Sequence, residues 1–291
     1  MEIKTLKIEN ENYPKLLKKI PNPPKVLYFR GKLLKDETCF AIVGTRRCSD
    51  YGKEIAFSTA RELAQEGITV VSGMARGIDT LSHQGALEGK GRTIAVLGTG
   101  LDEKSIYPKE NLNLARKILE NGGCLISEYT AGMPGRKQNF PERNRIISGL
   151  SLGVLVVEAK LKSGALITAS CAWNQKRKVF ATPGPLHSSN SKGPHLLIKK
   201  GAKLVEKTDD ILKELNLSLP QKIFARKIKR ETENAEKILA VLKEGGLPID
   251  KIIEKTKLSP QLVSSTLSLM EIEGKVKNLG NNIYARLGRK I

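Results

Sequence analysis

Cysteine and histidine are scarce in this chain of 291 residues, which holds four of the former and three of the latter. The cysteines lie far apart without a C-x-x-C pair, and the histidines are not spaced as a set of metal ligands. Neither a zinc site nor a disulfide framework is therefore indicated, and we expect reduced thiols, no metal and no cofactor.

Long apolar runs are also missing. No stretch approaches the roughly 18 residues that a membrane-spanning helix needs, and the start, MEIKTLKIENEN, lacks the apolar core of a signal peptide. These absences predict a cytoplasmic protein that is neither secreted nor inserted into a membrane.

Common cofactor and catalytic motifs are absent as well. The chain has no G-x-G-x-x-G fingerprint, no Walker G-K-T and no G-x-S-x-G nucleophile elbow. A strand-like run ends in Ser72 and Gly73 without the acid that would bind a ribose hydroxyl. We therefore expect no nicotinamide cofactor and a protein that is not an enzyme.

Positive charge is what the sequence has in excess. Lysine and arginine number 50 against 30 acidic residues, a formal net charge of +20, and aromatic residues make up only 4%. This balance favours a polyanionic partner, either nucleic acid or an anionic membrane. An ordinary basic protein without such a partner is the simpler alternative.

Short β-rich runs alternate with helix-length segments from residue 39 onward. An amphipathic helix is expected over 50–66, ended by Gly67. Such alternation predicts right-handed βαβ units on a parallel sheet, an α/β fold. The expected strands are 39–44, 68–73, 92–98, 123–128, 153–159 and 179–183, and a helix, a short strand at 203–206 and a closing helix complete the domain by residue 215.

The C-terminal part of the chain has a different pattern. Residues 216–233 are mixed and highly charged, which predicts a linker. Three helices and two strands around a Gly-Asn-Asn turn are then typical of a small winged-helix domain over 234–291. We expect the helices near 234–244, 249–256 and 259–273, with Ser259 and Pro260 at the start of the third. Residues 1–40 are expected to pack on the main domain, 41–215.

Three loops with glycine follow expected strands and lead into helices. A helix start offers free N–H groups and the positive end of the helix dipole to phosphate, and parallel strands place such loops along one edge of the sheet. Each loop alone is equally compatible with an ordinary turn and cap, but three together with cations favour a phosphate-rich ligand. The candidate residues are Gly44, Thr45, Arg46, Arg47, Ser72, Gly73, Ser163, Gly164 and Thr168.

A further stretch, KQNFPERNRIISGLS at residues 137–151, concentrates cations. Pro141 suits the first turn of a helix, and Arg143 shares a face with the apolar residues that follow, so it should face the cleft. Phe140 is a candidate platform for base stacking, and an ordinary core phenylalanine is an equal alternative.

The acids near these loops are expected to have structural roles. Asp79 and His83 share a helix face, and capping by Asp79 with core packing is favoured over a catalytic pair. Glu128 and Glu158 lie at the ends of two expected strands. We expect them to hold Arg143 or Arg145 in place, with acid/base catalysis as the alternative.

The sequence resembles the DNA-processing protein A (DprA/Smf) family. The resemblance rests on GTRRCSDYG, SGMARGIDTLSHQGAL, LGTGLDEKSIYPKEN, ISEYTAGMPGRKQNFPERNRIISGLS, VVEAKLKSGALITA and TPGPLHSSNSKGPHLLIKKGA, which occur in the family's order over roughly residues 11–215. It implies an extended Rossmann-like domain that binds single-stranded DNA without catalysis. It also implies protection of single strands in natural transformation, loading of the RecA recombinase past single-strand-binding protein, and a homodimer.

The resemblance also implies which residues bind DNA. The family's phosphate-binding arginine falls on Arg46, and its lysine and aromatic residue fall on Lys137 and Phe140. Its R-N-R motif corresponds to Arg143, Asn144 and Arg145, and its S-G-A phosphate loop to residues 163–165.

Two features depart from the family's pattern. We expect the extra N-terminal helical domain of some members to be missing, since few residues precede Tyr13. The expected recognition helix, SPQLVSSTLSLMEIEG, contains no lysine or arginine, although helices that lie on duplex DNA normally use them. We expect the winged helix to pack or to contact protein, and Lys275 and Lys277 leave weak DNA contact open.

Two other functions remain open at this point. A hydrolase of a related Rossmann-like fold would hold a nucleotide's phosphate in the same loops and would need Glu128 or Glu158 as its acid or base. A pure adaptor would use the basic surfaces only to recruit proteins.

Overall fold

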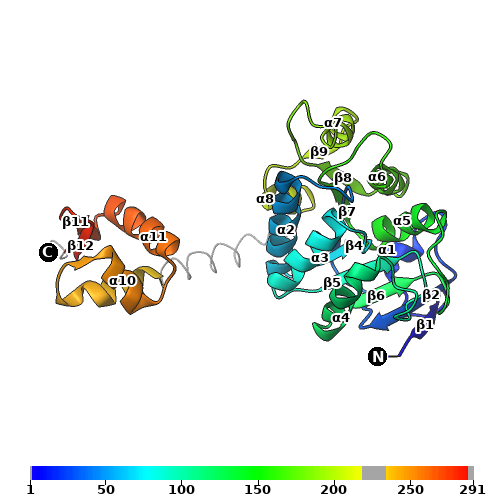
Figure 1. Cartoon of the computed structure of the whole chain (residues 1–291), viewed down its shortest axis with the longest axis horizontal. Helices are drawn as coiled ribbons and strands as arrows, with labels where there is room; N and C mark the ends of the chain where they lie inside the picture. The colour runs from blue at the N-terminus through cyan, green and yellow to red at the C-terminus, as the bar shows by residue number, and fades with distance from the viewer. Residues whose placement is uncertain (1, 218–233, 288–291) are drawn as a thin grey trace. The chain divides into compact units, whose positions relative to one another are not determined.

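The computed structural model describes residues 2–217 and 234–287, and the chain divides into two compact units between Leu217 and Ser218 (Figure 1). The predicted linker, 216–233, lies outside the described residues from position 218 onward. The first unit holds a nine-stranded sheet in the order β1-β2-β6-β5-β4-β3-β7-β8-β9. Its seven strands from β6 to β9 run parallel, whereas β2 pairs antiparallel with both β6 and β1. The predicted α/β fold with a parallel sheet is confirmed.

The elements of the first unit follow the predicted alternation. The strands are β1 (Lys4–Lys7), β2 (Val26–Gly31), β3 (Cys39–Val43), β4 (Thr69–Ser72), β5 (Thr93–Leu97), β6 (Cys124–Ser127), β7 (Gly153–Val156), β8 (Lys178–Ala181) and β9 (Lys203–Leu204). The helices are α1 (Lys15–Lys18), α2 (Asp50–Gln65), α3 (Ile78–Glu88), the 3-10 turn η1 (Lys109–Asn111), α4 (Leu112–Glu120), α5 (Asn139–Leu150), α6 (Gly164–Asn174), α7 (Lys192–Lys199) and α8 (Thr208–Glu214). No helix among the described residues is long and apolar enough to cross a membrane.

Helices cover both faces of the sheet, because its central strands are apolar on both sides. In β3 all five residues are buried. Cys39, Ala41 and Val43 pack with apolar residues of α1, α5, α6 and α7. Phe40 and Ile42 point the other way, toward residues of α2, α3 and α8. Strands that are buried on both faces are typical of parallel sheets in α/β proteins.

The first 40 residues extend the sheet. Strands β1 and β2, which the sequence pattern did not indicate, pair with each other, and β2 pairs with β6. Between them Tyr13 and Leu17 are fully buried, and a Cβ on Gly149 of α5 would lie only 2.7 Å from the Leu17 side chain. A glycine at this point of α5 therefore allows the N-terminal segment to pack closely against the helix.

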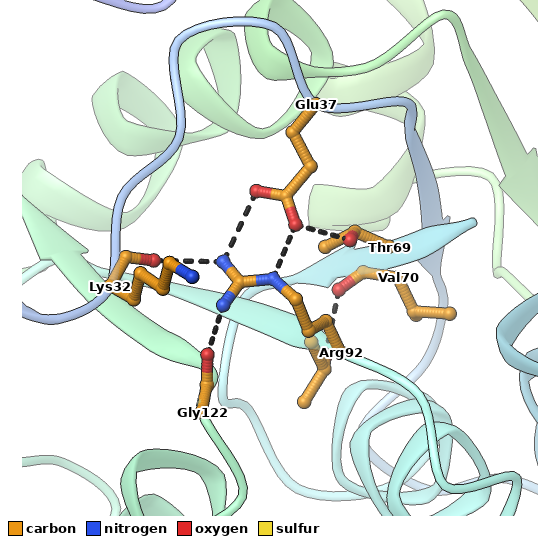
Figure 2. A network of polar contacts seen from close by, with 7 residues as sticks. Lys32, Glu37, Thr69, Val70, Arg92 and Gly122 are labelled. Carbon is orange, nitrogen blue, oxygen red and sulfur yellow. Dashed lines mark hydrogen bonds and ion pairs between the residues drawn. The ribbon is translucent and has the colours of Figure 1, made fainter. Parts of the chain in front are cut away.

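A buried ion pair fastens this segment at the amino ends of the strands (Figure 2). Glu37, just before β3, accepts a 2.5 Å hydrogen bond from Arg92 Nε and another from the Thr69 hydroxyl. The same guanidinium donates to the carbonyls of Lys32 and Gly122. Arg92 thus joins the loop after β2, the start of β5 and the turn before β6.

The order of the strands places one crevice at the carboxyl edge. From β3 the chain adds β4, β5 and β6 on one side and then returns to add β7, β8 and β9 on the other side. Helix α2 follows β3 onto one face, and α6 follows β7 onto the opposite face. The two loops therefore diverge where β3 and β7 lie side by side, which is the point where open α/β sheets bind ligands.

The second unit is a winged helix with its own core. It contains a helix over 234–241, η2 (Leu242–Glu244), α10 (Ile249–Thr256) and α11 (Pro260–Ile272), with a sheet of β10 (Leu247–Pro248), β12 (Ile283–Arg286) and β11 (Val276–Asn278). Apolar residues from these helices and from β11 form the core. The Ser259 hydroxyl accepts from Leu262 N–H, as a predicted N-cap does. The winged-helix prediction is confirmed, and the short strand β10 is additional to it.

Replacement of Arg92 by alanine should lower the free energy of unfolding by about 2 to 3 kcal/mol, because it leaves the buried Glu37 carboxylate without its cation. Arg116→Ala is the matched control. It breaks an ion pair with Glu103 whose side chains are about half exposed, so its cost should stay below about 1 kcal/mol. Urea unfolding measures both, and equal costs would contradict the role assigned to Arg92.

Candidate nucleic-acid interface

A cleft of about 750 Å³ opens at the carboxyl edge between β3 and β7. It brings together predicted residues from the loop after β3, from the 137–151 stretch and from the start of α6. The predicted residues that line it are Gly44, Thr45, Arg46, Arg47, Lys137, Phe140, Arg143, Asn144, Ser163, Gly164 and Thr168. Loops far apart in the sequence therefore form one surface, as the parallel sheet predicts.

The cleft is strongly cationic. Six lysines and arginines line it against one carboxylate, Asp79, which is only 6% exposed. Two of the six, Lys160 and Lys162, were not among the predicted residues. They flank the S-G-A loop in the sequence KLKSGA, and that adjacency was the signal that could have found them. Such a surface attracts a polyanion.

A smaller cavity of about 230 Å³ adjoins the cleft on the β4 and β5 side. Predicted Gly73 lines it, together with Arg76 and Tyr107, neither of which was predicted. Tyr107 lies in the LGTGLDEKSIYPKEN segment and is 49% exposed. The cavity gives the site an aromatic wall as well as a cationic one.

Phe140 forms part of that wall and is not a core residue. Its ring is half-buried and lines both cavities. The Arg46 guanidinium lies 5.7 Å from the ring centroid, and the Tyr107 ring is 5.8 Å away at a tilt of 50°. This arrangement combines a cation and an aromatic face, the pair that commonly binds a stacked base next to its phosphate.

Arg143 lines both cavities and also supports the strand ends. Its side chain comes from α5, and its guanidinium donates to the carbonyls of Gly73 and Val96, after β4 and within β5. Burial lowers the pKa of Arg143 to about 10, while the Asp79 carboxylate opposes that shift. The group therefore keeps its charge at neutral pH, and one side chain serves both the scaffold and the cleft.

Gly73 leaves the space that Arg143 requires. A Cβ at this position would lie 2.6 Å from both the Arg143 guanidinium and the Asp79 carboxylate. Asp79 does not cap its helix as predicted, since α3 begins after Gly77 and the carboxylate instead accepts from Ala75 N–H. Gly77 has a φ of +75° and would place a Cβ 2.5 Å from the Thr45 carbonyl, so the tight turn there requires glycine.

His83 lies deeper in the same helix. It is fully buried, and its Nδ1 lies 2.6 Å from the Thr93 hydroxyl. Burial lowers the pKa of His83 to about 3, so the ring is neutral. Asp79 and His83 are both enclosed side chains, which supports the predicted packing role over a catalytic pair.

The start of α2 is filled by the protein itself. Glu158 is 3% exposed, and its carboxylate accepts from both the backbone N–H and the hydroxyl of Ser49. Asn190 donates to the same carboxylate at 3.3 Å. The predicted phosphate site at this helix start is therefore occupied by a side chain, and Glu158 holds a helix end instead of an arginine.

The start of α6 remains accessible from the cleft. The Ser163 hydroxyl accepts from Ala165 N–H, and no acid lies in the first turn of α6. A Cβ on Gly164 would meet nothing within 4 Å. Asn144 donates to the Gly164 carbonyl at 3.1 Å and so positions this turn. Among the predicted helix starts, α6 is the one whose dipole faces the cleft.

Two predicted residues are not brought to the cleft. The Ser72 hydroxyl is fully buried and donates to the Ile42 carbonyl inside the sheet. Arg145 makes a two-pronged bond to Glu128 at 2.8 Å on each oxygen. Since helical residues rotate by about 100° each, Arg145 points away from the face that carries Arg143. Glu128 does hold an arginine, as predicted.

Arg143→Ala should reduce the free energy of unfolding by about 3 kcal/mol, because two strand-end carbonyls and the buried Asp79 lose their cationic partner. Lys137→Ala, which removes an exposed cation of the same cleft, should change it by less than about 0.5 kcal/mol. Urea unfolding of both variants tests this. A stable Arg143→Ala variant would remove the scaffold role.

Comparison with known proteins agrees with this geometry. A family model described as DNA recombination-mediator protein A matches residues 4–216, and one described as DprA winged helix domain matches residues 225–282. Protein Smf of Escherichia coli is 40% identical over 290 residues, which cover 97% of this chain and 76% of that protein. DNA processing protein DprA of Bacillus subtilis is 45% identical over 215 residues, 73% of this chain and 71% of the relative.

Solved structures show the same fold. DNA processing protein A from Streptococcus pneumoniae superposes with a TM-score of 0.68 at 41% identity and covers 74% of this chain and 75% of its own. DNA processing protein A from Helicobacter pylori superposes with a TM-score of 0.66 at 34% identity, and the match covers 74% of this chain and 96% of that protein. Its structure is described as giving insight into a single-stranded DNA binding mode. By sequence and fold, this chain belongs to the DNA recombination-mediator protein A (DprA/Smf) family.

Proposed function

We propose that the first unit binds single-stranded DNA in the cationic cleft without catalysing a reaction. The observation that carries the proposal is the composition of the cleft, where six cations and the open start of α6 surround a half-buried phenylalanine and only one enclosed acid is present. The relative from Helicobacter pylori, described as binding single-stranded DNA, supports the same ligand.

Each part of the cleft has a chemical role in this proposal. Arg46, Arg47 and Lys137 neutralise phosphates, as do Lys160 and Lys162 on the opposite wall. Backbone N–H at the start of α6 donates to a further phosphate oxygen. The Phe140 ring stacks on one base, and since every base has a π-face, little sequence preference is expected.

The shape of the site favours single strands over duplex. The Phe140 ring is half-buried between the walls of the cleft and stands against Arg46 and Tyr107. A base can reach it only when it is unpaired and unstacked from its neighbours, which costs energy in a duplex. A flexible single strand can turn its bases inward and keep its phosphates on the cations.

Both acids that a hydrolase would need have other partners. Glu158 is held by Ser49 and Asn190, and Glu128 is held by Arg145. A general acid or base must be free to reach the bond that reacts. This engagement supports the non-catalytic proposal over the nucleotide hydrolase.

Replacing Lys162 by glutamine should weaken binding of labelled oligo-dT and reduce the salt slope of log K by about 0.7, the value of one phosphate contact on a single strand. Lys117→Gln, which removes an exposed cation of α4 outside both cavities, should leave the slope unchanged. Fluorescence anisotropy across a series of salt concentrations measures this. A parent protein whose affinity does not respond to salt would contradict the proposal.

The family likeness supports a proposal for the biological role. We propose that the chain acts in the cytoplasm as a homodimer, protects single strands in natural transformation or recombination, and loads RecA past single-strand-binding protein. The expected recognition helix, α11, carries no cation, which supports a protein-contacting role for the winged helix.

In a test with single strands coated by single-strand-binding protein, addition of the full chain should shorten the lag before RecA hydrolyses ATP. Sedimentation of the same preparation reports whether it is a dimer. A Lys162→Gln chain should be slower, because loading depends on holding the strand. A lag that the parent chain does not shorten would contradict the loading role. It would not contradict DNA binding, which the oligo-dT salt series tests separately.

A further inference from the structure

The positive charge of the main domain is unevenly distributed. Residues 39–142, which supply β3 to β6, contain 13 lysines and arginines and 12 acidic residues. Residues 143–205, which supply β7 to β9, contain 11 lysines and arginines and one acidic residue. The single acid is Glu158, which is enclosed at the start of α2. Of these cations, Lys160 and Lys162 line the cleft and Lys192 begins α7, whereas Lys178 and Lys203 start β8 and β9 and pair with Glu214.

The loop between β8 and α7 is fixed beside the cleft on that side. Asn190 donates to the carbonyl of Arg47, a cleft residue, at 3.1 Å. The Asn190 carbonyl accepts from Ala159 N–H at 2.7 Å, and Gly193 N–H donates back to the Ala159 carbonyl at 2.8 Å. These bonds join three loops at the sheet edge and make the surface of the β8–α7 loop continuous with the cleft.

This adjoining surface exposes a cation and large apolar groups. Lys192 begins α7 and is exposed. Leu186 in the loop is 80% exposed, and the ring of Tyr51, at the start of α2, is 37% exposed. The Tyr51 hydroxyl donates to the Pro183 carbonyl at 2.6 Å, which holds the ring against the loop. We call Tyr51, Leu186 and Lys192 the exit surface.

Tyr51 has a counterpart on the other side of the site. Among the described residues, Tyr51 and Tyr107 are the aromatic side chains with large exposure. Tyr107 stands toward β5, and Tyr51 stands toward β8. The neighbouring acid, Asp50, is exposed and paired with Lys53 at 2.8 Å, and a second exposed acid, Glu54, lies about one turn further along α2.

We propose that a single strand longer than the cleft continues over the exit surface, with a base stacked on Tyr51 and a phosphate at Lys192. The inference rests on the proposed DNA-binding function and adds to it a direction and a longer footprint. Alternating cations and exposed apolar rings are the features that hold successive phosphates and bases of a single strand.

The test compares labelled oligo-dT of about 5 and about 20 nucleotides, lengths that fall below and above the typical site of one binding domain. Tyr51→Leu should bind the long oligonucleotide about tenfold more weakly than the parent, through the loss of one stacked base, and bind the short one equally well. Lys192→Gln should reduce the salt slope for the long oligonucleotide alone, by about 0.7.

Two control variants separate stacking from support of the loop. Tyr51→Phe keeps the ring and loses the bond to Pro183, so it should match the parent at both lengths. Lys104→Gln removes an exposed cation from the β5 side and should change neither the length dependence nor the slope.

Three results would overturn the inference. Tyr51→Leu could bind the long oligonucleotide as the parent does, which would leave the cationic side for a different polyanion such as an acidic protein segment. Tyr51→Leu and Tyr51→Phe could lose affinity equally at both lengths, which would make Tyr51 a support of the loop. A parent that binds neither length would overturn the proposed function itself, and this inference with it.

Discussion

The change in the direction of sheet growth between β3 and β7 is the constraint on which the site depends. Because successive strands are added outward on both sides of this pair, the loops that follow β3 and β7 leave toward opposite faces. Nothing in the sheet can close the gap between them. Arg143 then anchors one wall, since its guanidinium ties α5 to the carbonyls of Gly73 and Val96.

The cleft is cationic because the acids nearby are used inside the protein. Glu158 closes the start of α2, Glu128 holds Arg145, and Asp79 is enclosed beside Arg143. Each carboxylate is therefore engaged by partners within the protein. The lysines and arginines along the edge keep their charge available for a partner, and charge of one sign in a concave site concentrates a polyanion there.

Much of the fold was predictable, because it follows from local patterns. Buried runs such as CFAIV predicted the parallel strands, whereas β1 and β10 were missed because short strands at a sheet edge lack such runs. Strand β2 was also missed, although it carries the run VLYF, and most of its residues are only partly buried. Candidate residues on loops directly after strands also reached the cleft, as Arg46 and Ser163 did. Lys160 and Lys162 were missed because lysine is common on any surface.

The sequence by itself determined the class of fold, the loops that meet at one edge and the cationic character of that edge, since these depend on periodicity, glycine positions and net charge. Only the tertiary structure decided which neighbouring side chains share a partner. Arg143 and Arg145 are two residues apart, yet one enters the cleft and the other binds Glu128. The physical reason is that the rotation of a helix and the contacts of its surroundings set the direction of each side chain, and local sequence does not contain those contacts.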